Sequence, residues 1–144
     1  IAFRLTGDRH EAEDMVQEAF RSAWKSRELY QPGRGDRAWL ASILRRRVID
    51  RYRRQAPPST FASDSPHEVE VHDTDPISHQ YTDEMQHALA QLPEELRETL
   101  LLVVVGELTH QEVADLMEIP LGTVLSRVSR ARRRLRELLL AAKT

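Results

Sequence analysis

The stretch LTHQEVADLMEIPLGTVLSRVSRARRRL, residues 108–135, contains two helical patterns separated by a short break. Thr109 and Glu112 stand three residues apart before an apolar run, which is the spacing of a capping box at the start of a helix. Pro120 prevents this helix from continuing, and a second helical pattern follows at once. A short capped helix, a tight turn and a longer second helix predict a helix-turn-helix.

The second helix of this motif is basic. Its apolar positions recur at helical spacing and are expected to point inward: Val124, Val128, Ala131, Leu135 and Leu138. Its Arg and Ser residues are expected to point outward. After Glu118 the only acid is Glu137, while the cations are Arg127, Arg130, Arg132, Arg133, Arg134, Arg136 and Lys143. This pattern favours DNA binding; an all-helical bundle with a basic C-terminus is the alternative.

The formal net charge of −2 hides an uneven distribution along the chain. Residues 1–56 hold 13 Arg and Lys against 8 Asp and Glu, residues 57–93 hold none against 7, and residues 94–144 hold 8 against 8. The basic first block and the basic C-terminal helix are the two parts of the chain suited to nucleic acid.

The middle of the chain is predicted to be an acidic, flexible linker. PPSTFASDSPHEVEVHDTDPISHQ, residues 57–80, combines prolines with Ser, Thr, Asp and Glu and lacks a sustained period. The alternation at Val69 and Val71 is compatible with a lone strand, which has no partner strand here. The spacing of His67, His72 and His79 is irregular, so we expect solvated histidines and no metal site.

The segment DRHEAEDMVQEAFRSAWKSRE, residues 8–28, is predicted to be an amphipathic helix. Asp8 and Glu11 can cap its start. The expected buried stripe consists of Ala12, Met15, Val16, Ala19, Phe20, Ala23 and Trp24. The opposite face is acidic and carries Glu13, Asp14, Gln17 and Glu18.

A loop and a second, Arg-rich helix follow. ELYQPGRGD, residues 28–36, contains one proline and two glycines and is predicted to be a loop. In RAWLASILRRRVIDRYRRQ, residues 37–55, the expected inner face is Trp39, Leu40, Ile43, Leu44, Val48, Ile49 and Tyr52. Arg45, Arg46, Arg53 and Arg54 are expected to lie largely outside, where they suit phosphate neutralisation, although a merely solvated charged face is the alternative.

Two more helices are expected between the linker and the helix-turn-helix. YTDEMQHALAQL, residues 81–92, places Met85, Leu89 and Leu92 on one face, and Pro93 suits the first turn of the next helix. Gly106 is expected to end that helix in a left-handed conformation. The fold class is therefore all-α, with two small helical domains joined by the linker, at 1–56, 57–80 and 81–144.

Composition limits the classes of function. The chain has no cysteine, which excludes disulfides and thiolate metal sites and fits a reducing cytoplasm. The run Leu100–Val105 is too short to cross a bilayer, which takes about 18 residues. No glycine-rich phosphate loop, metal-ligand spacing or nucleophile with its base is present, so we expect no enzyme, cofactor or metal. Because a helical pattern is already under way at Ile1, we expect a further segment to precede it.

Two motifs in the right order resemble the extracytoplasmic-function (ECF) group of bacterial sigma factors. LTGDRHEAEDMVQEAF, followed by the Arg-rich helix, is similar to the segment that docks on RNA polymerase in that family. Residues 108–135, with their GTV-SR-RAR pattern, are similar to the helix-turn-helix of the second domain. The resemblance covers nearly the whole chain except the linker and implies a sigma factor that directs core polymerase to promoters.

The resemblance also implies roles for residues in the first domain. Asp14, Gln17 and Glu18 would dock on a basic coiled coil of the largest polymerase subunit, steered by charge complementarity. The loop at Leu29–Asp36, with Tyr30 and Arg34, would capture an extruded base of the minus-ten element. The helix with Arg45, Arg46, Arg53 and Arg54 would bind the separated strand. The alternative for Tyr30 is that its side chain packs in the core and does not contact a base.

In the second domain, the residues that the resemblance places against the minus-thirty-five element are Thr123, Ser126, Arg127, Ser129, Arg130 and Arg132. Three departures from the family pattern affect promoter preference or strand binding: Leu125, Ser129 and Arg46. The implied partners are core RNA polymerase, promoter DNA and an anti-sigma factor. The implied location is the bacterial cytoplasm, where the anti-sigma factor can also hold the chain at the membrane. The alternatives are a conventional helix-turn-helix regulator that binds duplex operator DNA without polymerase, and an interaction protein that binds no DNA.

Overall fold

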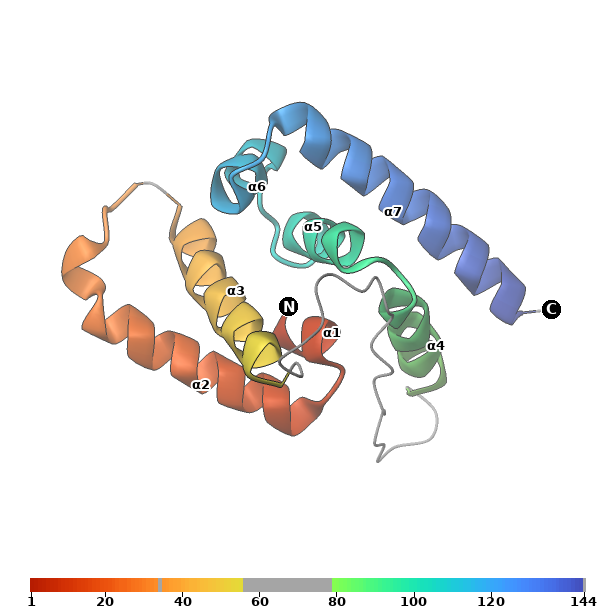
Figure 1. The fold of residues 1–144 in the computed structure, drawn as a ribbon, viewed down its shortest axis with the longest axis horizontal. Coiled ribbons are helices and arrows are strands. Elements are labelled where there is room, and N and C mark those ends of the chain that lie inside the picture. The colour runs from red at the N-terminus through yellow and green to blue at the C-terminus, as the bar shows by residue number, and fades with distance from the viewer. Residues whose placement is uncertain (34, 56–78, 144) are drawn as a thin grey trace.

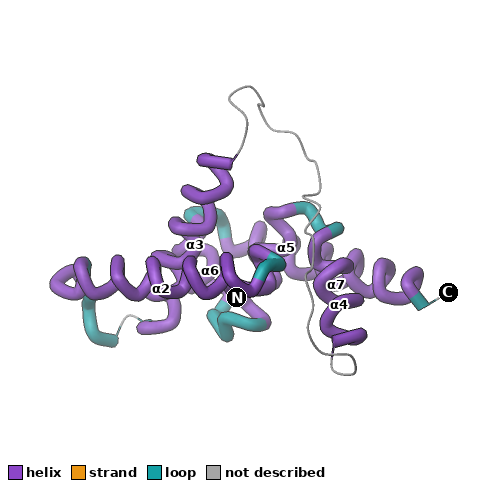
Figure 2. The backbone as a smooth tube through the Cα atoms, turned by 90° about the horizontal axis from the view of Figure 1, so that it is seen from below, coloured by secondary structure: helices purple, strands orange, loops and turns teal. Residues whose placement is uncertain are grey.

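The structure, a computed structural model, describes residues 1–33, 35–55 and 79–143. These residues form seven α-helices and one short 3-10 helix, with no strand among them (Figure 2). The all-α prediction is therefore confirmed. Arg34 and residues 56–78 lie outside the described residues. The latter include most of the linker predicted at 57–80, with Val69, Val71, His67 and His72.

The first helical group consists of α1 (Ala2–Thr6), α2 (Arg9–Lys25), the 3-10 helix η1 (Arg27–Leu29) and α3 (Asp36–Gln55). Asp8 caps α2 as predicted, because its carboxylate accepts a hydrogen bond of 2.8 Å from the Glu11 amide. The helices α2 and α3 run in roughly opposite directions (Figure 1). The hydroxyl of Tyr52 in α3 donates to the Leu5 carbonyl at 2.9 Å and so ties α3 to α1.

The predicted buried stripe of α2 is partly wrong. The helix buries Ala12, Met15, Ala19 and Ala23, which are spaced three or four residues apart. Val16 is exposed at the edge of this stripe, and Phe20 and Trp24 are 60% and 70% exposed. Small alanines let α2 approach α1 and α3 closely along a narrow contact, so the bulky side chains one position further round the helix remain outside.

The second helical group consists of α4 (His79–Ala90), α5 (Glu94–Val104), α6 (His110–Met117) and α7 (Leu121–Ala142). Pro93 precedes α5 as its N-cap. The expected left-handed glycine at the end of α5 is wrong: Glu107 has φ 54°, whereas Gly106 has no positive φ. A glycine is needed at position 106 because of close packing. A Cβ there would lie 2.6 Å from the Leu102 carbonyl oxygen and 2.8 Å from Ile1 Cδ1.

The helix-turn-helix is confirmed in the structure. Thr109 and Glu112 form both hydrogen bonds of the predicted capping box at the start of α6. The helix ends at Met117, and Glu118 adopts a left-handed conformation with φ 56°. Pro120 then caps α7, which buries Val124, Val128 and Ala131 against α5 and α6.

The two helical groups touch each other. Figure 1 shows α1–α3 on one side and α4–α7 on the other, with α3 facing α5 and α6. Helix α1 contacts α5, and α3 contacts α6. The buried apolar residues of both groups join in one continuous core that includes Leu5, Val48 and Leu102.

Candidate nucleic-acid interface

Helix α7 presents a polar surface around its first three turns. Ser126, Ser129, Arg130 and Arg132 are exposed, and Thr123 is half-buried. The Ser126 hydroxyl donates to the Thr123 carbonyl at 3.1 Å, and Arg130 Nε donates to the Ser126 carbonyl at 3.4 Å. Because the Val124, Val128 and Ala131 side chains fix the helix from behind, these polar groups are held on a rigid face.

Arg127 differs from its neighbours. The prediction that it points outward is wrong, because its side chain is only 15% exposed and its Nη2 lies 2.9 Å from Glu95 Oε2 of α5. Leu125, on the other side of Ser126 in the sequence, points outward and is 49% exposed. Leu125 was missed as a surface residue because an apolar side chain in a helix gives no sign that it is exposed.

On the acidic face of α2, Asp14 and Glu18 have no ion pair among the residues that the structure describes. Asp14, Gln17 and Glu18 are all exposed, as predicted. Glu13, one residue away, forms an exposed 3.5 Å pair with Arg9. The carboxylates of Asp14 and Glu18 are therefore available to an outside partner, and the exposed Phe20 and Trp24 extend the same helix surface with apolar area.

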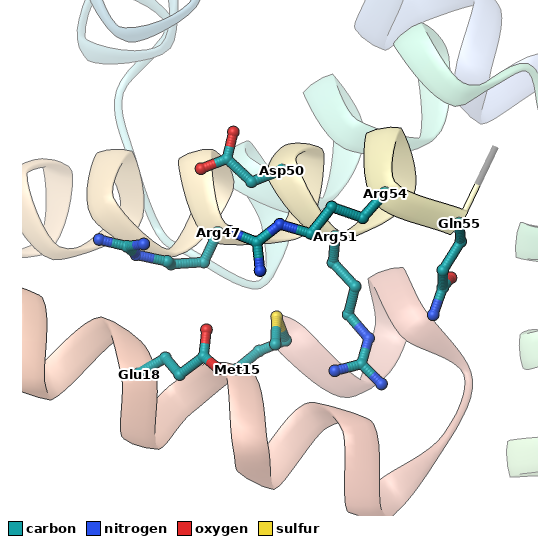
Figure 3. A pocket seen from close by; sticks show the side chains of 7 residues that line it. All are labelled: Met15, Glu18, Arg47, Asp50, Arg51, Arg54 and Gln55. Atoms are coloured by element: carbon teal, nitrogen blue, oxygen red, sulfur yellow. The ribbon is translucent and has the colours of Figure 1, made fainter. Parts of the chain in front are cut away.

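A small pocket of about 220 Å³ separates α2 from α3 next to Glu18 (Figure 3). Arg47 and Arg54 line it from α3, and Met15 and Glu18 line it from α2. Arg51 also lines the pocket, and it pairs with Glu11 at 2.8 Å. The Nε atom of Arg47 is buried without a hydrogen-bond partner among the described residues, so a donor is left over beside the acidic face.

The predicted minus-ten residues have different surroundings. Tyr30 is half-buried; its ring centroid lies 4.9 Å from that of Trp39, and its hydroxyl donates to the Asp36 carboxylate. Arg46, Arg53 and Arg54 are exposed on α3, as expected. Tyr30, which already packs on Trp39, is therefore in different surroundings from the exposed guanidinium groups further along α3.

Arg45 is the exception among the α3 arginines. It was expected to lie largely outside, but its side chain is only 28% exposed and its Nε lies 2.5 Å from Glu98 Oε1 of α5. Burial raises the pKa of the Glu98 carboxyl, and the nearby Arg45 partly opposes this rise. Sequence reasoning missed this contact because Arg45 and Glu98 lie 53 residues apart, on opposite sides of the linker.

An apolar groove of about 680 Å³ runs between α4, α5 and α7. Its floor is formed by Met85, Leu89, Leu100, Leu101, Val104, Val105, Leu135, Leu139 and Leu140. Among the described residues, its rim carries the cations Arg4, Arg132, Arg136 and Lys143 and no acid. Arg132, predicted to face DNA, thus also borders this groove.

No group of three or more metal-binding side chains occurs in the described part of the chain. Within the same residues, none of the helices combines the length and the apolar character needed to cross a membrane.

Comparison with known proteins decides the family. Two family models match, sigma-70 region 2 at residues 1–57 and sigma-70 region 4 at residues 82–135. The ECF RNA polymerase sigma factor EcfG of Rhodopseudomonas palustris is 33% identical over 139 residues, which cover 96% of this chain and 77% of EcfG. This chain belongs to the ECF sigma factors. The ECF sigma factor SigE of Mycolicibacterium smegmatis is 34% identical, and the match spans 56% of its length.

Two solved structures have a fold similar to that of this ECF sigma factor. RpoE of Bartonella quintana, in complex with the anti-sigma factor NepR, matches with a TM-score of 0.75 and 28% identity over 96% of this chain and 86% of that chain. CnrH, in complex with the cytosolic domain of CnrY, matches with a TM-score of 0.72 and 26% identity over 97% and 79% of the two chains.

The family matches include most residues singled out from the sequence. Asp14, Gln17 and Glu18 lie within the region 2 match, as do Tyr30 and the α3 arginines. All six residues selected on α7 lie within the region 4 match. Two acids of this ECF sigma factor, Glu98 and Glu107, contact the first helical group and were not predicted to do so. A single acid in a sequence gives no sign of a partner that is distant along the chain.

Proposed function

We propose that this ECF sigma factor directs core RNA polymerase to specific promoters and takes part in opening them. The carrying observation is the presence of two unlike surfaces on the two helical groups. One is the acidic face of α2, with Asp14 and Glu18 exposed, and the other is the basic face on the second helix of a helix-turn-helix. We further propose domains at residues 1–56 and 81–144, joined by a linker at 57–80. The chain then acts by binding and not as an enzyme.

Asp14, Gln17 and Glu18 are proposed to contact core polymerase. Their exposure and their lack of cationic partners among the described residues support this role. A basic coiled coil on the polymerase would meet two free carboxylates, and the unlike charges would raise the rate of association. The Arg47 Nε left over in the neighbouring pocket offers a donor for an acidic group on the same partner.

The minus-ten residues are proposed to be Tyr30, Arg34, Arg45, Arg46, Arg53 and Arg54. Arg46, Arg53 and Arg54 are exposed on one helix and can neutralise successive phosphates of a separated strand. Tyr30 and Trp39 form an aromatic pair next to the loop, on which an unstacked base can pack. Arg34 lies outside the described residues, so its assignment rests on the family resemblance alone.

The minus-thirty-five residues are proposed to be Thr123, Ser126, Arg127, Ser129, Arg130 and Arg132. Exposed Ser126, Ser129 and Arg130 can donate to phosphates or to base edges in the major groove. Arg127, tied to Glu95, is suited to hold α7 in place and to contact a phosphate with its remaining donors. Leu125 adds an apolar contact of the kind that recognises the thymine methyl group.

An anti-sigma factor is proposed as the regulatory partner, in the bacterial cytoplasm. The groove between α4, α5 and α7 supports this, because an amphipathic helix with an apolar stripe and acidic flanks would match its apolar floor and cationic rim. The structural relative RpoE of Bartonella quintana was solved in complex with the anti-sigma factor NepR.

A binding measurement tests the docking role. The full chain would be titrated with bacterial core polymerase, comparing Glu18→Lys with Glu13→Lys, which makes the same change of charge on the neighbouring turn. We expect Glu18→Lys to weaken binding at least tenfold, since one truncated charge contact at an interface costs about 2 kcal/mol or more. Glu13→Lys should stay within about threefold of the unchanged chain. Equal effects of the two variants would contradict the assignment.

The main alternative is a regulator that binds duplex operator DNA by itself. The exposure of Ser126, Ser129 and Arg130 in the free chain favours it, because α7 needs no rearrangement to reach DNA. Such a regulator would bind duplex DNA tightly without polymerase and would tolerate Glu18→Lys.

A further inference from the structure

The pocket between α2 and α3 contains an arginine whose hydrogen bonds the fold does not complete. The Nε atom of Arg47 is buried there and has no hydrogen-bond partner among the described residues. A buried donor without a partner lowers the stability of the folded state. An arginine at this position therefore costs stability, as is expected of a residue that serves binding and not folding.

The other cations around the pocket differ in how far they are already paired. Arg51 pairs with Glu11 at 2.8 Å, and Gln55 Nε2 donates to the same carboxylate at 3.4 Å. Arg54 is exposed, and neither it nor Arg47 forms an ion pair within the part of the chain that the structure describes. The pocket therefore offers the guanidinium groups of Arg47 and Arg54 to an acid from outside.

Two acids also line the pocket, Glu18 from α2 and Asp50 from α3. Figure 3 shows Asp50 pointing away from α2, while Arg47 and Arg54 lie on the edge of α3 nearer to α2. Every phosphate of a DNA strand is negative, so a strand crossing the pocket would bring further phosphates close to these two acids. A protein surface that presents one acid among cations avoids this repulsion. The mixed charges thus favour a protein partner over a strand.

The pocket adjoins the face of α2 that is proposed to dock on core polymerase. Glu18 belongs to both, and Asp14 lies four residues before it on the same helix. A partner helix that places a cation against Glu18 can present an acid three or four residues further along on the same face. Met15 is buried and lines the pocket, so the apolar stem of such an acid has a surface to pack on. The volume of about 220 Å³ is enough for the end of one side chain.

We propose that this pocket receives the carboxylate of one acidic residue of core RNA polymerase, with Arg47 as its ligand and Arg54 adding positive charge at the mouth. The docking contact then has two signs, since Asp14 and Glu18 bind cations of the polymerase and the pocket binds an acid. This inference rests on the proposed function, because it takes this face of α2 to dock on polymerase. It gives Arg47 a docking role, distinct from the DNA contacts proposed for other arginines of α3.

The test measures binding of the full chain to bacterial core polymerase in the absence of DNA. Arg47→Met removes the guanidinium group and keeps most of the apolar stem. The matched control is Arg9→Met, which removes the same charge from an exposed arginine of α2 that does not line the pocket. Urea unfolding measures the stability of each variant, and titration with a single-stranded oligothymidylate measures any contact of the free chain with DNA.

We expect Arg47→Met to bind core polymerase about tenfold or more weakly than Arg9→Met, because an acid buried at the interface loses its charged partner. Arg47→Lys, which keeps the charge, should bind better than Arg47→Met. The urea midpoint of Arg47→Met should stay the same or rise, since the variant removes a buried donor without a partner. Binding of the oligothymidylate should equal that of the control.

Unchanged binding of Arg47→Met to core polymerase would overturn the proposal. Weaker binding of the oligothymidylate, with binding to polymerase unchanged, would also overturn it and identify the pocket as a phosphate site. In both cases a loss of polymerase binding in Glu18→Lys would leave the proposed function intact. Unchanged polymerase binding in Glu18→Lys would instead contradict the proposed docking face, and with it the proposal.

Discussion

The Arg127 Nη2 atom lies 2.9 Å from Glu95 Oε2, so the recognition helix α7 is tied to its supporting helix α5 by a cation that is itself a proposed DNA ligand. We predict that Arg127→Ala lowers both stability and DNA affinity, whereas Arg130→Ala lowers affinity alone. The stability loss for Arg127→Ala should be about 1 kcal/mol, since Glu95 is exposed and screened by solvent. Urea unfolding and titration of duplex DNA against salt measure the two effects. Equal stability of the two variants would contradict this role of Arg127.

Gly106 and Gly122 should respond in opposite ways to alanine. At Gly106 the new methyl group would meet the Leu102 carbonyl and the Ile1 side chain, so the free energy of unfolding should fall by about 1–3 kcal/mol. Nothing lies within 4 Å of a Cβ at Gly122 in α7. Alanine there should raise the free energy of unfolding by about 0.5–1 kcal/mol. Thermal or urea unfolding of the two variants decides the matter. A stable Gly106→Ala variant would show that Ile1 does not pack there.

The capping box at Thr109 should contribute measurably to the helix-turn-helix. Thr109→Ala removes the acceptor for the Glu112 amide and should lower the free energy of unfolding by about 1 kcal/mol. Thr109→Ser keeps an oxygen at the same place and should cost little. If serine and alanine were equally destabilising, the lost methyl group and not the cap would be responsible.

Glu98 should make stability depend on pH. Burial raises the pKa of this carboxyl above its ordinary value of 4.5, with Arg45 opposing the rise, so the folded state holds the proton more tightly than the unfolded state. The free energy of unfolding should therefore fall as pH increases from about 4.5 through the raised pKa, and then level off. Glu94 also raises this pKa and Arg127 lowers it. Urea unfolding between pH 4 and pH 7 should show that the decrease is smaller in Glu98→Gln; identical curves would contradict it.

Local patterns predicted the secondary structure well. Caps such as Asp8–Glu11 and Thr109–Glu112, and breaks such as Pro120, depend on residues a few positions apart, so they are legible in the chain itself. Gly106 shows the limit: its neighbour Ile1 is 105 positions away, and the close approach that excludes a Cβ cannot be inferred from spacing.

Side-chain exposure was predicted less well. The apolar residues of α2 cover so wide a sector of the helix that the sequence does not show which of them are buried. Packing against α1 and α3 buries Ala19 and leaves Phe20 exposed. Arg45 and Arg127 were expected outside because arginines usually are, but each has an acid on α5 as its partner. The roles in docking and DNA binding came from the family resemblance and stay predictions.

Promoter opening tests the central claim most directly. Purified chain and core RNA polymerase would be incubated with genomic promoter fragments, and heparin-resistant open complexes would be measured for the unchanged chain and for Asp14→Lys with Glu18→Lys, both shown to be folded. The sigma-factor account predicts opening that depends on polymerase and is lost in the variant. Tight duplex binding without polymerase and no opening with it would contradict the account.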